Sequence, residues 1–229
     1  MTERAAGNWI KRAMDVVMSV IGLFVLSPLL GVVALAIRYR MGSPVLFRQP
    51  RPGLNGRPFV LVKFRTMREP MPTEQPVVEQ ELVTGLGSFL RLTSIDELPQ
   101  FWNILKGDMS MVGPRPLAME YLPRYTPEQA RRHTVRPGLT GWAQVHGRHM
   151  LSWEERFTLD VWYVDHWSLW LDIRVLFMTV LKVFQGAGKV PPATADFGSV
   201  DLPETQARAR VSASESHVGT SSRDTRDGD

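Results

Sequence analysis

Two adjacent carboxylates, Asp96 and Glu97, precede an apolar run within the stretch Ser94–Lys106. An ionised carboxylate can attack phosphorus as a nucleophile, and it can also bind Mg²⁺. A serine followed three residues later by a glutamate is equally typical of a helix capping box, which would explain the acid without catalysis. Either interpretation places both acids at the start of a helix that Gly107 ends, where the helix dipole favours carboxylate and phosphate.

Basic residues surround this acidic pair in the sequence. Arg91 lies five residues before the first acid, and Arg115 stands between two prolines that restrict its backbone and prepare its guanidinium for bidentate binding. Several cations beside two carboxylates would suit a diphosphate bound with Mg²⁺, although each cation alone is also explained as a solvated surface charge. The other candidate phosphate or nucleotide ligands are Lys63, Arg136 and Arg148.

Composition narrows the classes of chemistry. The chain has 229 residues and no cysteine, which excludes disulfides, thiolate catalysis and cysteine metal sites. The net charge is +4, of which residues 190–229 contribute −3, so residues 1–189 carry +7. A basic body indicates an anionic partner such as a phosphate, a nucleotide or a membrane surface. The sequence has no nucleic-acid motif, no Walker A or Gly-x-Gly-x-x-Gly element, and no histidine spacing typical of zinc.

One apolar segment indicates a membrane protein. Val16–Ile37 is 22 residues without a charge, about 33 Å long as a helix, which is enough to span a bilayer. A signal peptide cleaved after Ala34-Leu35-Ala36 is one alternative, but its apolar part is normally only about 7–15 residues long. A simple membrane-spanning helix is the second alternative.

Two features favour a re-entrant helix over a spanning one. Basic residues flank the segment on both sides, and such residues prefer the cytoplasmic face of a membrane. Pro28 cannot donate a hydrogen bond to the carbonyl of Phe24, so the helix can bend there, and the Ser27 hydroxyl is available to that carbonyl. We therefore expect a helix broken at Ser27-Pro28 that enters and leaves the membrane on the same side.

The rest of the chain predicts an α+β fold that is mainly helical, with small strand elements. Four parts are expected: a basic segment at 1–12, the re-entrant helix at 13–40, a catalytic domain at 41–188 and a disordered tail at 189–229. The aromatic-rich helix at 153–184 would lie either in the membrane interface or in an ordinary core. Strands are expected at Val45–Phe47 and Phe59–Met67, a loop at 69–80, and further helices at Glu81–Arg91 and Ser94–Lys106. Tyr121–His133 is expected to contain a short helix that begins after Thr126-Pro127, an N-cap followed by proline, and Arg136–Arg148 a glycine-punctuated loop with a short strand.

Eight short motifs follow one another along the chain between Asn8 and Phe184. They are Lys11-Arg12 with Asp15, Ser27-Pro28, Arg51-Pro52-Gly53, Lys63-Phe64-Arg65-Thr66-Met67, Asp96-Glu97-Leu98-Pro99-Gln100, Lys106-Gly107-Asp108-Met109-Ser110, Val112-Gly113-Pro114-Arg115-Pro116 and Arg136-Pro137-Gly138-Leu139-Thr140-Gly141-Trp142. Each motif alone is modest, but the ordered set resembles the bacterial sugar transferase family in its small form, the monotopic phosphoglycosyl transferases.

The resemblance implies a reaction. Members transfer a phosphosugar from a UDP-sugar to undecaprenyl phosphate and release UMP, using Mg²⁺ and a covalent intermediate, in the first membrane step of glycoconjugate synthesis. Carried to this chain, Asp96 would be the nucleophile, and Glu97 would support the metal or the acceptor, with both acids as Mg²⁺ ligands. Lys63, Arg91 and Arg115 would contact phosphates. The sugar would be an N-acetylated hexosamine or a diacetamido sugar.

The resemblance also implies a place and partners. The protein would be monotopic in the bacterial inner membrane, among phospholipids and amphipathic interfacial helices, with its catalytic domain on the cytoplasmic face. A homodimer and downstream glycosyltransferases are candidate partners, and no nucleic acid is expected. Two alternatives are a membrane-bound Mg²⁺-dependent phosphatase or pyrophosphatase, which would pass its intermediate to water, and an adaptor that binds acidic lipids without catalysis.

Overall fold

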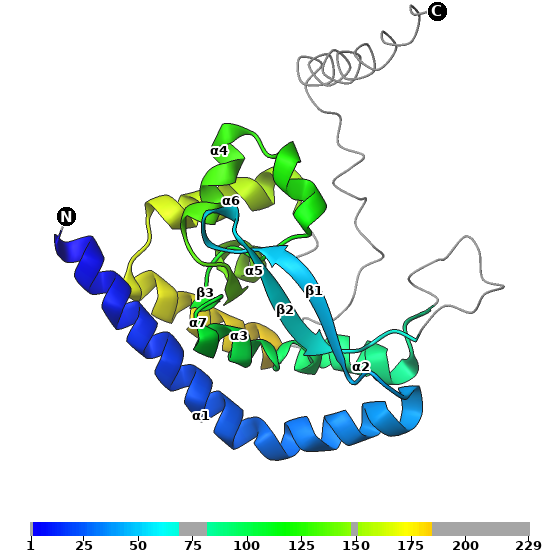
Figure 1. Ribbon diagram of the computed structural model, residues 1–229. Helices are drawn as coiled ribbons and strands as arrows, with labels where there is room; N and C mark the ends of the chain where they lie inside the picture. Colours follow the sequence, from blue (N-terminus) through cyan, green and yellow to red (C-terminus); the bar gives the residue numbers. More distant parts are fainter. Residues whose placement is uncertain (1, 69–81, 148–150, 185–229) are drawn as a thin grey trace, which may run out of the picture. The chain divides into compact units, whose positions relative to one another are not determined.

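The computed structural model describes residues 2–68, 82–147 and 151–184, and it shows the mainly helical α+β fold that the sequence predicts (Figure 1). The expected loop at 69–80 and the tail at 189–229 lie outside the described residues. The helices are α1 (Thr2–Met41), α2 (Gly85–Thr93), α3 (Gln100–Lys106), α4 (Pro127–Ala130), α5 (Trp142–His146), α6 (Trp153–Asp165) and α7 (Leu169–Phe184), and the strands are β1 (Leu46–Pro52), β2 (Pro58–Phe64), β3 (Ser110–Val112) and β4 (Gly138–Thr140).

Helix α1 is continuous for 40 residues and changes direction part-way along its length (Figure 1). Pro28 lies inside it and has no N–H for the carbonyl of Phe24. The Ser27 hydroxyl donates to that carbonyl at 2.7 Å, which confirms the predicted local repair. The segment Gly7–Met41 is long and apolar enough to cross a membrane, and only 11% of its most apolar window is buried within the protein. Most of its apolar surface therefore needs another apolar environment.

The first half of α1 is held to the body of the protein by its basic residues. The guanidinium of Arg12 donates to the carbonyls of Ile104 at 2.6 Å and Leu105 at 2.7 Å, which lie in the last turn of α3. Lys11 donates to the carbonyl of Val112 at 3.0 Å. Cations satisfy the free carbonyls at a helix C-terminus well, because the helix dipole is negative there.

The second half of α1 packs on the same body. Ile37 is fully buried in a small apolar cluster with Phe64 of β2 and Leu90 of α2. The buried guanidinium of Arg65 donates to the carbonyl of Met41, the last residue of the helix. Both ends of α1 are therefore attached to one folded body.

Strands β1 and β2 form an antiparallel hairpin in which Leu46 pairs with Phe64 and Pro52 pairs with Pro58. The side chain of Asn103 on α3 continues the hydrogen bonding of β2, because it accepts from the Val62 N–H at 3.0 Å and donates to the Val60 carbonyl at 2.7 Å. Side chains alternate between the faces of a strand. One face of β2 carries Phe59, Leu61 and Lys63, and the other carries Val60, Val62 and Phe64.

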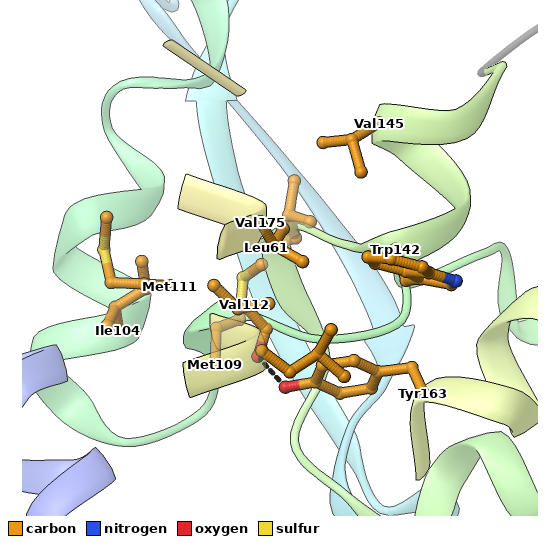
Figure 2. Packing of buried hydrophobic residues seen from close by; sticks show 10 residues of the cluster. Leu61, Ile104, Met109, Met111, Val112, Trp142, Val145, Tyr163 and Val175 are labelled. Carbon is orange, nitrogen blue, oxygen red and sulfur yellow. Dashed lines mark hydrogen bonds between the residues drawn. The ribbon is translucent and has the colours of Figure 1, made fainter. Parts of the chain in front are cut away.

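The main core lies where β3, α3, α5, α6 and α7 meet (Figure 2). Tyr163 of α6 is almost fully buried, and its hydroxyl donates to the carbonyl of Val112 at 3.2 Å, the bond dashed in Figure 2. The same hydroxyl donates to Asp172 at 2.6 Å. The chain segments around the parallel strands β3 and β4 approach each other closely. A Cβ added to Gly113 would lie only 2.4 Å from the carbonyl oxygen of Arg136.

The aromatic-rich segment is two helices rather than one. Helix α6 buries Phe157 and Tyr163 in the core, while its exposed Trp162 stacks on the buried Trp142 of α5 with ring centroids 4.9 Å apart. Helix α7 instead has one buried face, with Val175, and one exposed apolar face, with Trp170 at 74% exposure and Phe177. Helix α6 is therefore a core helix, although its tryptophans are not buried, and the exposed face of α7 is suited to a membrane interface.

The predicted capping box at Ser94 is wrong. Ser94 has a left-handed backbone (φ 58°), ends α2, and forms no side-chain cap to the turn that follows. The acids lie in a 3-10 turn, Ile95–Glu97, and the α-helix begins only at Gln100. A proline is tolerated in the first turn of an α-helix but disrupts its interior, which explains why α3 begins after Pro99 and not at Ser94. Gly107 ends α3 with φ 94°, as predicted.

Candidate active site

The site is built around Asp96, which the 3-10 turn places between α2 and α3 and against β2. The carboxyl is buried, with 6% of the residue exposed. Burial, and then the neighbouring charge of Glu97, raise the pKa of Asp96 from 3.8 to about 6. The side chain is therefore mostly ionised at neutral pH, although the protein gives it little solvation. A poorly solvated carboxylate is a more reactive nucleophile than a hydrated one.

Three cations lower the pKa of Asp96 and so oppose the increase caused by burial and by Glu97. In order of influence they are Lys63, Arg115 and Arg91, the same three for which phosphate contacts were expected. Burial lowers the pKa of Lys63, while Asp96 opposes that change. The Lys63 ammonium also lies 5.2 Å from the centre of the Phe47 ring across the hairpin. The structure thus brings together groups from β2, α2 and the segment after β3.

Arg115 forms an ion pair with Glu97, with 2.6 Å between Nη2 and Oε1. The charge of Glu97 is the main reason that the pKa of Arg115 is raised. About half of the Arg115 side chain remains exposed, so it is also able to contact a ligand. The prolines on either side fix its backbone, as the sequence predicts.

The backbone of Arg115 is supported from inside the protein. Arg132, which is almost fully buried, donates from Nη2 to the Arg115 carbonyl at 2.7 Å and to Asp160 at 2.7 Å. Its Nη1 donates to the Tyr125 hydroxyl at 3.0 Å. This buried group was not found from the sequence, because its members are far apart in the chain and match no motif.

Arg91 is positioned by a close contact between α2 and the end of β2. Its Nε donates to the Thr66 hydroxyl at 2.9 Å. A Cβ on Gly87 would lie only 1.8 Å from the Thr66 carbonyl oxygen, so only glycine allows α2 to pack this closely. Thr84 caps the helix by accepting from the N–H of Gly87 at 2.9 Å.

The structure places one of the two remaining candidate cations, and that one lies elsewhere. Arg136 donates from Nε to the carbonyl of Gly107 at 3.0 Å and so supports the end of α3. Arg148 lies outside the described residues. Arg51 is a cation that the sequence analysis did not assign to the site, although it belongs to one of the motifs. Burial and the nearby charge of Arg115 lower the pKa of Arg51, which places it beside the cluster.

The residues present fit a Mg²⁺ ion bound together with a phosphate ligand. Mg²⁺ commonly takes one or two carboxylates, and waters and substrate phosphates complete its coordination. Asp96 and Glu97 are adjacent carboxylates that meet this requirement. Among the residues that the structure describes, no group of three or more acids or histidines is arranged to hold a metal without a substrate.

Comparison with known proteins agrees with these features. Residues 6–186 match the model of a family described as bacterial sugar transferase. The chain belongs to this family. Its members are sugar transferases, and this one has a helix that is suited to membrane association.

Three relatives illustrate the range of similarity. An uncharacterized sugar transferase, EpsL, of Bacillus subtilis (strain 168) is 50% identical over 180 residues, which are 78% of this chain and 89% of that protein. A UDP-glucose:undecaprenyl-phosphate glucose-1-phosphate transferase of Escherichia coli (strain K12) is 42% identical over 76% of this chain and 40% of its own length. A protein with the same activity in its name, from Caulobacter vibrioides, is 44% identical over 77% of this chain and 70% of its own length. The chain therefore spans less than half of the Escherichia coli relative.

Proposed function

We propose that the protein transfers a hexose 1-phosphate from a UDP-sugar to undecaprenyl phosphate through a covalent intermediate on Asp96. The observation that carries the proposal is the buried carboxylate of Asp96 among three cations. A carboxylate that is ionised, poorly solvated and close to positive charge is suited to attack an anionic diphosphate. The names of the relatives support the same donor and acceptor.

The reaction has two balanced steps. In the first, an Asp96 oxygen forms a bond to the phosphorus that carries the sugar, and the bond from this phosphorus to the bridging oxygen breaks, so UMP leaves with that electron pair. In the second, a phosphate oxygen of the acceptor attacks the same phosphorus. The Asp96 carboxylate then leaves unchanged, and the product is undecaprenyl diphosphate sugar. No group is oxidised or reduced.

The surrounding residues make the first step electrostatically feasible. Lys63, Arg91 and Arg115 offset the repulsion between a carboxylate and a diphosphate. Asp96 and Glu97 would hold Mg²⁺, which when bound neutralises phosphate charge as a Lewis acid. The ion pair with Glu97 keeps the Arg115 guanidinium next to the reacting group. A site on the cytoplasmic face of the inner membrane would let the acceptor lipid react without leaving the bilayer.

The relatives' names change the expected sugar. Several of them specify UDP-glucose or glucose, and one is a galactosyl transferase of Streptococcus agalactiae. We therefore propose a UDP-hexose as donor, with glucose ahead of the N-acetylated and diacetamido sugars that the sequence analysis favoured.

Intact mass spectrometry tests the proposal directly. The purified protein is incubated with Mg²⁺ and one UDP-sugar at a time, without a lipid acceptor. An added hexose phosphate in the wild type, missing in Asp96→Asn and kept in the control Asp108→Asn, would support the covalent route. Asp108 is a suitable control because it pairs with Lys106 outside the Asp96 cluster. Steady UMP release without any lipid acceptor would indicate a phosphatase or pyrophosphatase instead. UMP release that begins only when undecaprenyl phosphate is added, with no adduct before that, would indicate direct transfer.

A further inference from the structure

A groove of about 800 Å³ lies between α1, the hairpin β1–β2 and α3. Its size falls within the range of about 300–1,000 Å³ that is typical of ligand sites. The wall from α1 includes Leu23 and Leu30, which stand on opposite sides of Pro28, so the groove follows the bend of this helix. Gly31 also lines it, and a Cβ added there would meet no atom within 4 Å.

The groove is separate from the catalytic cluster. Its hairpin wall includes Val62 and Phe64, whereas Lys63, which acts on Asp96, lies between them and so points to the other face of β2. Arg48 lies opposite Val62 in the hairpin and therefore shares the groove's face. A ligand in the groove would thus lie across the hairpin from the phosphates of the transferase reaction.

The lining requires an occupant with a long apolar part and a single negative charge. Most of the groove's lining side chains are aliphatic or aromatic, and its polar members are Asn103, Arg48 and Lys106. The Asn103 amide is already used by β2. Lys106 pairs with Asp108 at 2.9 Å, while Arg48 forms no hydrogen bond or ion pair with another described residue. With Asp108 included, the net charge at the rim is +1.

We propose that this groove is a binding site for one anionic phospholipid, whose chains fill the bend of α1 and whose phosphodiester faces Arg48. A phosphodiester has one negative charge, which matches the rim better than the doubly charged phosphomonoester of a polyprenyl phosphate. The surroundings favour a membrane lipid, because α1 is the helix suited to membrane association and Trp102 is half-exposed at the groove. The bound lipid would complete the contact between the two halves of α1 and the hairpin.

The test uses two pairs of matched variants of the full chain and requires no catalysis. Gly31→Trp would fill the groove, whereas Val32→Trp adds the same bulk to the exposed side of α1, where Val32 is 65% exposed. Arg48→Gln removes the rim charge, and Arg57→Gln removes one charge from an exposed position outside the groove. Each protein is purified in a neutral detergent and mixed with phosphatidylglycerol or phosphatidylcholine.

Two measurements decide the outcome. Native mass spectrometry should show one phosphatidylglycerol retained by the wild type, Val32→Trp and Arg57→Gln, and none by Gly31→Trp. Phosphatidylglycerol should raise the Tm of the wild type by about 5–10 °C, as expected for a ligand near saturation of a domain this size. In Arg48→Gln this lipid should stabilise no better than phosphatidylcholine, because the chains still fit but the charge contact is lost.

Other results would overturn the proposal. Equal loss in both tryptophan variants, or equal effects of both arginine variants, would mean a general attraction to the membrane surface. Displacement of the phospholipid by undecaprenyl phosphate, molecule for molecule, would assign the groove to the acceptor. The proposed function and the proposed lipid site are tested independently. If no hexose phosphate adduct forms on Asp96, the expected binding of phosphatidylglycerol in the groove is unchanged.

Discussion

Replacing Asp96 by asparagine should abolish transfer and yet stabilise the fold at neutral pH. The carboxyl is buried, and its pKa is raised from 3.8 to about 6, mainly by burial and then by Glu97. A pKa that is higher in the folded protein means that the folded state prefers the protonated acid. Ionisation above pH 6 therefore costs the folded state about 3 kcal/mol relative to the unfolded chain. Asparagine has nearly the same shape as the protonated acid and avoids this cost.

The pH dependence follows from the same values. Below pH 3.8 the acid is protonated in both states, and the wild type has no penalty. As the pH rises from 3.8 through about 6, the free energy of unfolding of the wild type falls, because the unfolded chain ionises Asp96 first. The full cost of ionising the buried acid is present at pH 7. The gap in stability between Asp96→Asn and the wild type should therefore open across this interval and stay constant above it.

Thermal unfolding of the two proteins from pH 4 to pH 7.5 would measure this gap. The samples contain a chelator and no nucleotide, so that neither a metal nor a substrate contributes charge at the site. A difference of about 3 kcal/mol corresponds to roughly 6–12 °C in Tm at pH 7 for a domain of this size. Asp108→Asn is the control, since it removes a partly exposed acid whose ion pair with Lys106 contributes little. Equal Tm values at pH 7, or a gap that does not depend on pH, would refute the reasoning.

Three further changes have distinct expected outcomes. Arg115→Lys keeps the positive charge but loses the paired N–H donors of the guanidinium, so the rate of UMP release should fall by about 10–100-fold with an unchanged Tm. Full activity would show that these paired donors are not needed. Asp160→Asn leaves its buried arginine partner unpaired and should cost about 3–5 kcal/mol in denaturant unfolding, against less than about 1 kcal/mol for the exposed Asp165→Asn. Equal losses would contradict this. Pro28→Ala restores a helical N–H and should move one end of α1 across the membrane in some molecules, as seen by cysteine labelling of both ends; labelling identical to that of the wild type would exclude a decisive role for Pro28.

Features that depend on local chemistry were predictable from the sequence. The helical hydrogen bond lost at Pro28 and its replacement by Ser27 follow from these two residues, although the helix continues through them, and the bond to the Phe24 carbonyl has the predicted form. Thr126 caps α4 in a full capping box with Gln129, as a Thr-Pro pair before a short helix indicates. The grouping of cations around the acidic pair also followed from residue type and from the resemblance to a family.

Features decided by distant contacts were not predictable. Ser94 matched a local capping rule, but its N–H bonds back to the Arg91 carbonyl at 3.2 Å and ends the preceding helix. Arg136 looked equivalent to the other cations, and only the fold shows that its guanidinium binds the carbonyl of Gly107. Helix α5, within a glycine-punctuated segment expected to be loop, was missed because its stability comes from the packing of Trp142.

Some motif residues are structural rather than catalytic, and local patterns cannot show this. Asp15 accepts hydrogen bonds from the Ser110 hydroxyl at 3.0 Å and from the Met111 N–H at 2.9 Å. Lys11 forms a largely buried ion pair with Asp172 at 2.6 Å, more than 150 residues away in sequence. These contacts join the start of α1 to the core.

The attachment of α1 at both ends has a consequence for the order of events during synthesis. The chain leaves the ribosome from its N-terminus at about 5–20 residues per second, so α1 emerges before Arg65 and before the α3 carbonyls that bind Arg12. When it is first made, the helix therefore has none of these partners, and Pro28 is already part of it. The contacts that hold both ends of α1 on the body form only when the later residues fold, and they fix the arrangement that the helix has by then.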